Sequence, residues 1–230
     1  MAHIPHRTPT AAALVLLGVT GIAMTTAAAA PPTPAPSDTP QAFTATVTRV
    51  SPDRLRHSWR RGCPVGPGDL RMISMTYWGF DDRPHMGELV VNRSVAEEVV
   101  SVFRKLYGQR FPIRQMQPVD AYKGSDDASM AADNTSAFNC RRVETSGSWS
   151  QHAYGLAIDV NPRLNPYIHP YPGGTVAPPN AKNYVRRPLD RPGVINPGDD
   201  VVNAFKKIGW GWGGSWSSEK DYQHFSQNGR

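Results

Sequence analysis

A histidine and an aspartate stand seven positions apart in the stretch SWSQHAYGLAIDV. His152 and Asp159 are residue types that bind divalent metal ions, and a second pair, Asp221 and His224, follows in DYQHF near the end of the sequence. A catalytic zinc site usually takes three ligands from His, Asp or Glu and leaves a fourth position to water. His152, Asp159 and His224 would form such a set. Asp221 would then lie close enough to act as a base on that water without being a ligand.

Each of these residues also has an ordinary structural explanation. A histidine followed by an aspartate is common by chance, His224 could be a hydrogen-bonded residue of a strand, and Asp221 could be a turn residue. Cys63 and Cys140 are alternative, softer metal ligands. The metal hypothesis therefore depends on the elements that carry these residues and on the wider sequence pattern.

The sequence GLAIDV, residues 155–160, is typical of a buried strand. Alternate residues of a strand face opposite sides. Asp159 therefore shares its side with Gly155 and Ala157, while the aliphatic residues face the other side. We expect Asp159 to lie on a face that its neighbours leave free of bulk.

The rest of the chain mixes predicted helices and strands with long loops. The helix over 94–108 has the clearest pattern, with Ser94 as N-cap, Glu97 completing a capping box and an apolar stripe at helical spacing. A regular βαβ repeat is missing, so this order of elements predicts an α+β fold. The other segments are predicted as strands (69–80, 87–92, 113–122 and 221–225), a helix (199–210), an exposed loop with one helical turn (123–137) and a long Pro- and Gly-rich loop (161–180).

The first thirty residues have the layout of a secretory signal peptide. They begin with one arginine and no acid, continue with the uncharged apolar run AAALVLLGVTGIAM and end with small residues. A membrane anchor is the alternative, but a membrane helix needs about 20 apolar residues and this run is shorter. Residues 31–45 follow as a Pro-rich spacer. Residues 46–230 are expected to form the functional domain of a secreted protein.

Export changes the interpretation of the cysteines and of the charge. Outside the cell Cys63 and Cys140 can pair, so we expect one disulfide, and two buried free thiols are the alternative. The formal net charge of +6 suits an anionic polymer such as a bacterial wall. The basic residues are scattered and no nucleic-acid-binding motif is found, so nucleic acid is not an expected partner.

The string SxHxxGxAxD over residues 150–159, followed far downstream by DxxH over 221–224, resembles the zinc D,D-peptidases of bacterial cell walls. These comprise the VanY-type D-alanyl-D-alanine carboxypeptidases, the related dipeptidases and the L-alanyl-D-glutamate peptidases of phage endolysins. The resemblance covers roughly residues 60–226 and includes FNCRR, residues 138–142, and the stretch GWGWGGSW. It implies the fold shared with Hedgehog domains, a small antiparallel sheet flanked by helices with long Pro- and Gly-rich loops.

The resemblance also implies roles for individual residues. The ligands of a Zn²⁺ cofactor would be two histidines and an aspartate, namely His152, Asp159 and His224. Asp221 would be the general base. Arg141 would polarise the scissile carbonyl or hold the substrate's carboxylate, with Arg142 as its near rival. Ser150 would bind a substrate carboxylate or brace the loop that carries His152.

The resemblance therefore implies a secreted zinc peptidase, monomeric by default, that cuts the stem peptides of peptidoglycan. D-alanyl-D-alanine carboxypeptidase activity is expected first because the VanY-like features are closest. An L-alanyl-D-glutamate endopeptidase would use the same machinery. Two further alternatives are a wall-binding module that keeps zinc without catalysis, and a structural secreted protein with an incidental His/Asp pair. No part of the mature protein is expected to stay inserted in a membrane.

Overall fold

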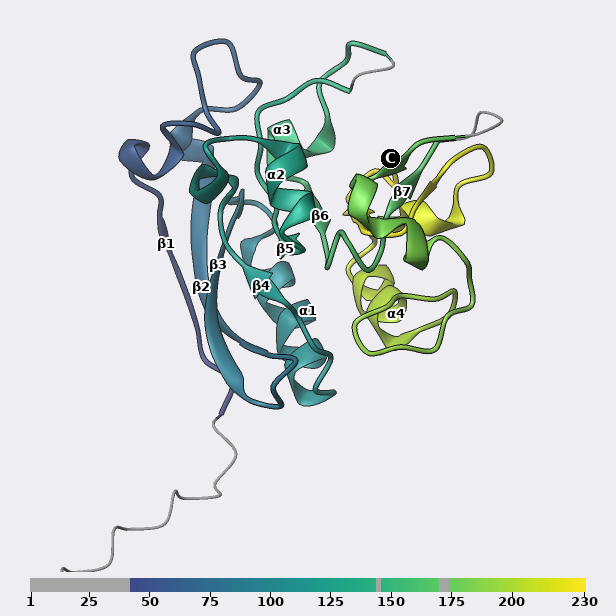
Figure 1. The fold of residues 1–230 in the computed structure, drawn as a ribbon. Coiled ribbons are helices and arrows are strands. Elements are labelled where there is room, and N and C mark those ends of the chain that lie inside the picture. The colour runs from purple at the N-terminus through teal and green to yellow at the C-terminus, as the bar shows by residue number, and fades with distance from the viewer. Residues whose placement is uncertain (1–41, 144–145, 170–173) are drawn as a thin grey trace, which may run out of the picture. The chain divides into compact units, whose positions relative to one another are not determined.

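The structure is a computed structural model and describes residues 42–143, 146–169 and 174–230 (Figure 1). The predicted signal peptide, residues 1–30, and most of the predicted spacer, residues 31–45, lie outside the described residues. Short helices and small, mainly antiparallel sheets make up the described part, which confirms the α+β expectation. The helices are α1 (Ala96–Gly108), α2 (Asp126–Ala131), α3 (Gln151–Tyr154) and α4 (Asp200–Lys207). The strands are β1 (Ala45–Arg49), β2 (Leu70–Trp78), β3 (Pro84–Asn92), β4 (Gln115–Met116), β5 (Asn134–Thr135), β6 (Ala157–Asp159), β7 (Tyr167–Ile168), β8 (Val176–Ala177), β9 (Gly211–Trp212), β10 (Lys220–Asp221) and β11 (His224–Ser226).

The two strands predicted over 69–80 and 87–92 form an antiparallel meander with β1, in the order β1-β2-β3, and the second begins earlier than predicted, at Pro84. Strand β2 is buried on both faces. Its residues Ile73 and Met75 belong to the main apolar core together with α1, whereas Leu70 and Met72 pack in a second cluster that includes Cys140. The sheet therefore lies between α1 and the segment that carries Cys140.

Helix α1 begins later than the sequence pattern predicts. The backbone N and the Oγ of Ser94 both donate to Oδ1 of Asn92, over 3.1 and 2.9 Å. Val95 takes the N-cap position without a side-chain hydrogen bond. The predicted N-cap and capping box are wrong because Asn92 binds the serine locally instead. The predicted apolar stripe is buried: Val95, Val99, Val102, Phe103 and Leu106.

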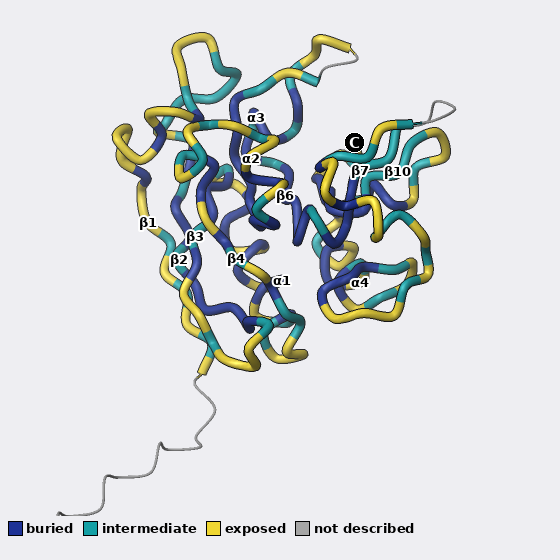
Figure 2. The backbone as a smooth tube through the Cα atoms, in the orientation of Figure 1, coloured by how far each residue is buried: buried dark blue, intermediate teal, exposed yellow. Residues whose placement is uncertain are grey.

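A second sheet has the order β6-β11-β9 and carries two of the candidate metal ligands. Figure 2 shows β6 as buried along its length. The apolar side of this sheet packs on the core through Ile158 and Phe225, both fully buried. Phe225 stacks on Phe205 of α4, with 4.0 Å between ring centroids. Trp210 and Trp212 join the same cluster, so the Gly/Trp stretch serves the core here.

The third sheet lies largely in the segment predicted as a long loop. Strands β7 and β8 fall within residues 161–180 and join β10 in the order β10-β7-β8. Strands of two residues carry no periodicity, which is why the sequence pattern missed them. The predicted strand 221–225 is two strands, β10 and β11. In the same way, 113–122 contains the short β4 followed by a 3-10 helix (Val119–Tyr122), and 123–137 contains the helix α2 and strand β5.

Buried amides fix the chain that leads from β6 to β7. Asn161 and Asn165 are both fully buried. Nδ2 of Asn165 donates to the carbonyl oxygen of Gly193 over 3.0 Å, and its Oδ1 accepts from Nη2 of Arg187 over 3.1 Å. The guanidinium of Arg187 also lies over the ring of Tyr222, 4.2 Å from its centroid. These contacts connect the loop after β6 to the residue that follows β10.

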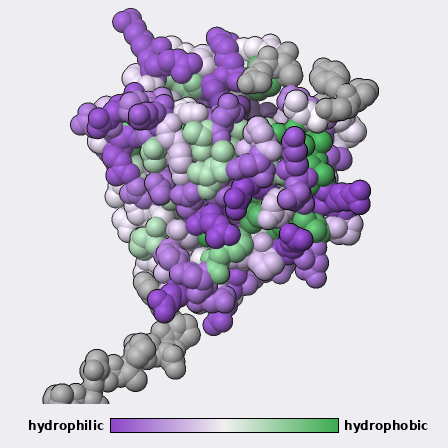
Figure 3. Space-filling model, in the orientation of Figure 1, coloured by the Kyte–Doolittle hydropathy of each residue, from purple (hydrophilic) through white to green (hydrophobic). Residues whose placement is uncertain are grey.

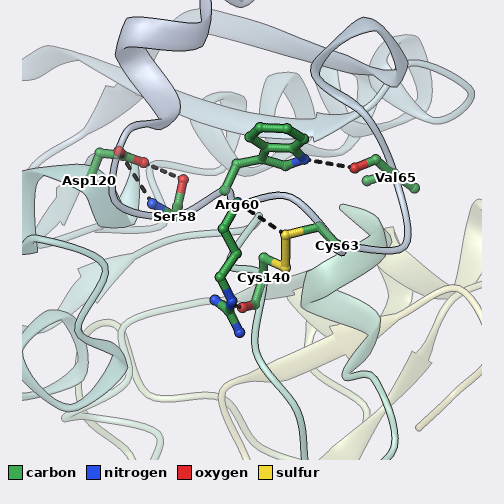
Figure 4. Close-up of a disulfide and its surroundings, with 7 residues drawn as sticks. Ser58, Arg60, Cys63, Val65, Asp120 and Cys140 are labelled. Atoms are coloured by element: carbon green, nitrogen blue, oxygen red, sulfur yellow. Dashed lines mark hydrogen bonds between the residues drawn. A yellow bond between two sulfur atoms is a disulfide. The ribbon is translucent and has the colours of Figure 1, made fainter.

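Cys63 and Cys140 form the expected disulfide (Figure 4). The loop around Cys63 has further contacts to the segment of Cys140. Nη1 of Arg60 donates to the carbonyl oxygen of Cys140 over 2.8 Å, and within the loop Nε1 of Trp59 donates to that of Val65 over 2.8 Å. The segment that precedes Arg141 is therefore held both covalently and by hydrogen bonds.

Figure 3 shows hydrophilic side chains over much of one face, with apolar patches between them. Among the described residues, Met86 is the large hydrophobic side chain that is clearly exposed. No helix in the described part of the chain is long and apolar enough to cross a membrane.

Candidate metal centre

Three almost fully buried side chains converge from α3, β6 and β11. His152 Nε2 lies 3.2 Å from Asp159 Oδ2, and His224 Nδ1 lies 3.2 Å from Asp159 Oδ1. The same two imidazole nitrogens are 3.2 Å apart. One possible ligand atom from each residue lies within 4.8 Å of the others. The fold thus brings together the residues predicted as ligands, and this group could hold a metal ion.

His152 is positioned by α3, a helix of only one turn. Ser150 is the N-cap of α3, and its Oγ accepts from the backbone N of His152 over 3.3 Å. Gly155 ends the helix with a φ of 69°, a left-handed conformation that favours glycine. A Cβ on Gly155 would lie 2.6 Å from the backbone N of Asn92 in β3. The serine and the glycine of the string therefore hold the turn that presents His152.

Strand pairing positions the other two ligands. Strands β6 and β11 are antiparallel, and His224 lies directly opposite Asp159. Directly opposite residues share a face, with Cβ atoms about 5 Å apart. The next pair on that face is Ala157 and Ser226, both small. The small residues leave room around the ligands, as the alternation in GLAIDV predicts.

The hydrogen bond of His152 indicates which of its nitrogens faces the site. Its Nδ1 lies 2.6 Å from the carbonyl oxygen of Ala137, so we assign the proton to Nδ1 and a lone pair to Nε2. A ligand histidine commonly donates its other N–H in this way. Although burial alone would raise it, the two imidazoles hold the pKa of Asp159 well below its ordinary value. Two imidazoles and one ionised carboxylate fit a divalent cation.

Asp221 lies on β10, beside the ligand group. Gly213 packs against its backbone so closely that a Cβ there would be 2.5 Å from the carbonyl oxygen of Asp221. Burial, together with the carboxylate of Asp159, raises the pKa of Asp221 to about 7, against the opposing effect of His224. Its Oδ1 is buried without a hydrogen-bond partner among the described residues. A carboxyl group in this state can accept and release a proton near neutral pH.

The two neighbouring arginines have different surroundings. Nε of Arg141 lies 3.0 Å from Oδ2 of Asp126. Although burial opposes it, the carboxylates of Asp126, Asp159 and Asp221 hold the pKa of Arg141 above its ordinary value. Arg142 is exposed, donates from Nη1 to the carbonyl oxygen of Gly147 over 2.6 Å and lies over a tryptophan ring. Arg141 is therefore the arginine that interacts electrostatically with the candidate ligand Asp159 and the candidate base Asp221.

All of these predicted site residues except His152 line one cleft of about 760 Å³. Trp149 and Trp216 form parts of its wall, and each carries a guanidinium over its ring, Arg142 at 4.2 Å and Arg230 at 5.3 Å from the centroid. A second cavity of about 590 Å³, between β3 and residues 116–121, contains none of the predicted site residues. The chemistry and the larger cavity therefore coincide.

Asp126 and Gln223 are among the side chains of this cleft that sequence patterns did not predict. Asp126 contacts Arg141 from the start of α2, in a segment that was predicted as an exposed loop with one helical turn. The residue that could have indicated the start of this helix in the sequence is Ser125. Its Oγ caps α2 by accepting a hydrogen bond from the backbone N of Ala128 over 3.2 Å. Gln223 is buried between the base and a ligand, and nothing in the DxxH spacing distinguishes it.

Residues 144–227 match the family model described as D-alanyl-D-alanine carboxypeptidase. The matched segment is less than half of the chain and includes both SxHxxGxAxD and DxxH, whereas Arg141 lies just before it. The predicted resemblance is confirmed over this segment. Comparison with curated proteins and with solved structures gave no match.

Proposed function

We propose that this chain is a zinc-dependent peptidase that hydrolyses peptide bonds in the stem peptides of peptidoglycan. The observation that carries the proposal is the convergence, in one cleft, of a buried His/Asp/His group with a carboxyl group whose pKa is close to neutral and with an arginine. The family match supports a peptidase. In this proposal the ligands are His152, Asp159 and His224.

The proposed metal would supply Lewis acidity and lower the pKa of a water molecule. The protein supplies the rest of the chemistry. Asp221 accepts a proton from the attacking water and then delivers it to the leaving amine. Because its pKa is raised while the pKa of Asp159 is lowered, Asp221 is the group near the ligands suited to move a proton in both directions.

Arg141 is proposed to stabilise negative charge on the substrate. Its guanidinium can polarise the scissile carbonyl or bind a terminal carboxylate with two parallel hydrogen bonds. The cation–π contact of Arg142 with Trp149 supports a lesser role for Arg142, in the wall of the cleft. The Oγ of Ser150 accepts from the backbone of His152, which supports bracing of the ligand turn over binding of substrate.

The preferred substrate in this proposal is a stem peptide that ends in D-alanyl-D-alanine, because an arginine beside the reacting centre suits a free carboxylate. An L-alanyl-D-glutamate endopeptidase is the alternative within the same chemistry. We further propose export by residues 1–30, a spacer over 31–45, a peptidase domain with the D,D-peptidase fold over 46–230, and action as a monomer in the cell wall.

The proposal is tested on the purified mature protein with three forms compared: wild type, Asp221→Ala, and Asp200→Ala as a charge-matched control. Asp200 lies on α4, its side chain is 67% exposed, and it is ion-paired with Lys105. Zinc content is determined for each form. Each is then incubated with a muropeptide ending in D-Ala-D-Ala, and the products are identified by mass spectrometry.

We expect about one zinc per chain in all three forms and cleavage by wild type and Asp200→Ala only. The mass lost identifies the bond that is cut. Zinc binding without cleavage of any stem-peptide bond would instead favour a wall-binding module. A wild-type protein without zinc would refute the metal hypothesis.

A further inference from the structure

Asp126 is a half-buried residue of the cleft wall to which the mechanism above gives no role. It is the first residue of α2, directly after the N-cap Ser125. The turn before it places Lys123 and Gly124 at positive φ, 55° and 77°. A Cβ on Gly124 would lie 2.4 Å from the carbonyl oxygen of His57. The start of α2 is therefore fixed by a tight turn against the loop of residues 56–66.

Both oxygens of the Asp126 carboxylate have partners in the segment FNCRR. Oδ2 lies 3.0 Å from Nε of Arg141, and Oδ1 lies 3.4 Å from Nδ2 of Asn139. Asn139 is itself buried, and its backbone N donates to the carbonyl oxygen of His152 over 3.2 Å. The carboxylate thus links α2 to the segment that packs behind His152.

The ion pair holds the Nε side of the guanidinium against the Asp126 carboxylate, without a directed hydrogen bond at Nε, and leaves the Nη edge to face elsewhere. Two further carboxylates, Asp159 and Asp221, act on Arg141 electrostatically. Without Asp126, the flexible arginine would be drawn towards one of them. An ion pair with Asp159 would compete with the metal for that ligand. An ion pair with Asp221 would lower the pKa of the base and so weaken it as a proton acceptor.

We propose that Asp126 is a positioning residue that holds Arg141 apart from Asp159 and Asp221 and directs its Nη edge towards the substrate. The proposal rests on the proposed function and adds to it a residue that acts through the arginine. Asp126 does not touch the substrate in this role. Its loss should resemble the loss of the arginine.

The kinetic test compares Asp126→Asn with Asp127→Asn. Asp127 is the next residue of α2, is exposed and carries the same charge, so the pair separates the contact from the helix and from net charge. We expect kcat/KM to fall about 10- to 100-fold in Asp126→Asn and to stay within about twofold in Asp127→Asn. Zinc content is expected to be equal in both.

A double-mutant cycle separates positioning from a merely structural role. If Asp126 acts through Arg141, adding Asp126→Asn to Arg141→Ala should cause no further loss beyond about twofold. Multiplicative losses, or equal activity of Asp126→Asn and Asp127→Asn, would overturn the proposal.

A readout that does not need activity is the Nε–H resonance of Arg141 in ¹⁵N spectra, assigned by its loss in Arg141→Lys. Because Nε is buried beside the Asp126 carboxylate, we expect slow solvent exchange of this proton in wild type and Asp127→Asn, and fast exchange or a shift in Asp126→Asn. An unchanged resonance in Asp126→Asn would overturn the positioning role. If the wild type cleaves no stem peptide, the proposed function fails, and this comparison still decides whether Asp126 holds Arg141.

Discussion

Replacing both half-cystines, Cys63→Ala with Cys140→Ala, is expected to lower the free energy of unfolding by ~4.5 kcal/mol at 25 °C. The bond joins positions 77 residues apart, and the magnitude follows from the entropy that a cross-link of that span removes from the unfolded chain. The native loop keeps other contacts, including Arg60 Nη1 to the carbonyl oxygen of Cys140. We therefore expect the variant to fold, with the effect located mainly in the unfolded state.

Urea unfolding followed by tryptophan fluorescence measures both the free energy of unfolding and the m-value. The free energy of unfolding should fall as stated, and the m-value should rise because an unfolded chain without the cross-link exposes more surface. The single variant Cys63→Ala, which leaves Cys140 without its partner, should show the same loss. A loss below about 1 kcal/mol with an unchanged m-value would refute the loop-entropy reasoning.

Three further predictions concern the site. Burial raises the pKa of Asp221 to about 7, so its ionisation destabilises the fold increasingly from about pH 4 to pH 7, and fully above that range. The metal-free Asp221→Asn variant should therefore have a higher Tm than metal-free wild type at pH 8 and an equal Tm at pH 4; an equal Tm at both would contradict the raised pKa. Gly155→Ala and Gly147→Ala both place alanine at a φ near +70°, but only Gly155 abuts the backbone of Asn92, so urea unfolding should show Gly155→Ala to be less stable by a further ~1–3 kcal/mol; equal losses would refute the contact. Chelation should lower Tm, and Zn²⁺ at 100 times its Kd should restore about 2.7 kcal/mol of stability in wild type but not in His152→Ala; a similar Zn²⁺ response in that variant would argue against His152 as a ligand.

Short-range spacing accounts for what the sequence predicted well. The alternation in GLAIDV determines which side of β6 Asp159 faces, and the stripe in 94–108 determines the buried side of α1. The match over residues 144–227 contains both strings that suggested the metal group. These features depend on neighbours a few positions away, which a sequence pattern records.

Two of the missed features depend on partners far along the chain, and a third depends on competition between near neighbours. The side chain of Arg141 is ion-paired with Asp126, fifteen positions earlier, and β7 acquires its strand conformation by pairing with β10. Ser94 had the residue type of an N-cap, but the side chain of Asn92 outcompeted the helix for it. Residue propensities cannot predict the outcome of such competition. Ser94 could form either the N-cap hydrogen bond or the bond to Asn92, and only the folded structure decides which one is more stable.

The direct pairing of Asp159 with His224 has a consequence for how this scaffold can diversify. The two residues are 65 positions apart, yet their spacing in space is fixed by one antiparallel ladder. The chain between them supplies β7, β8 and part of the cleft wall. Insertions or exchanges in that stretch can alter the wall while the ladder keeps its register. The spacing of Asp159 and His224 is thus set apart from the wall segments, and exchanging β7 and β8 offers a route to change the wall while Asp159, Asp221 and His224 are kept.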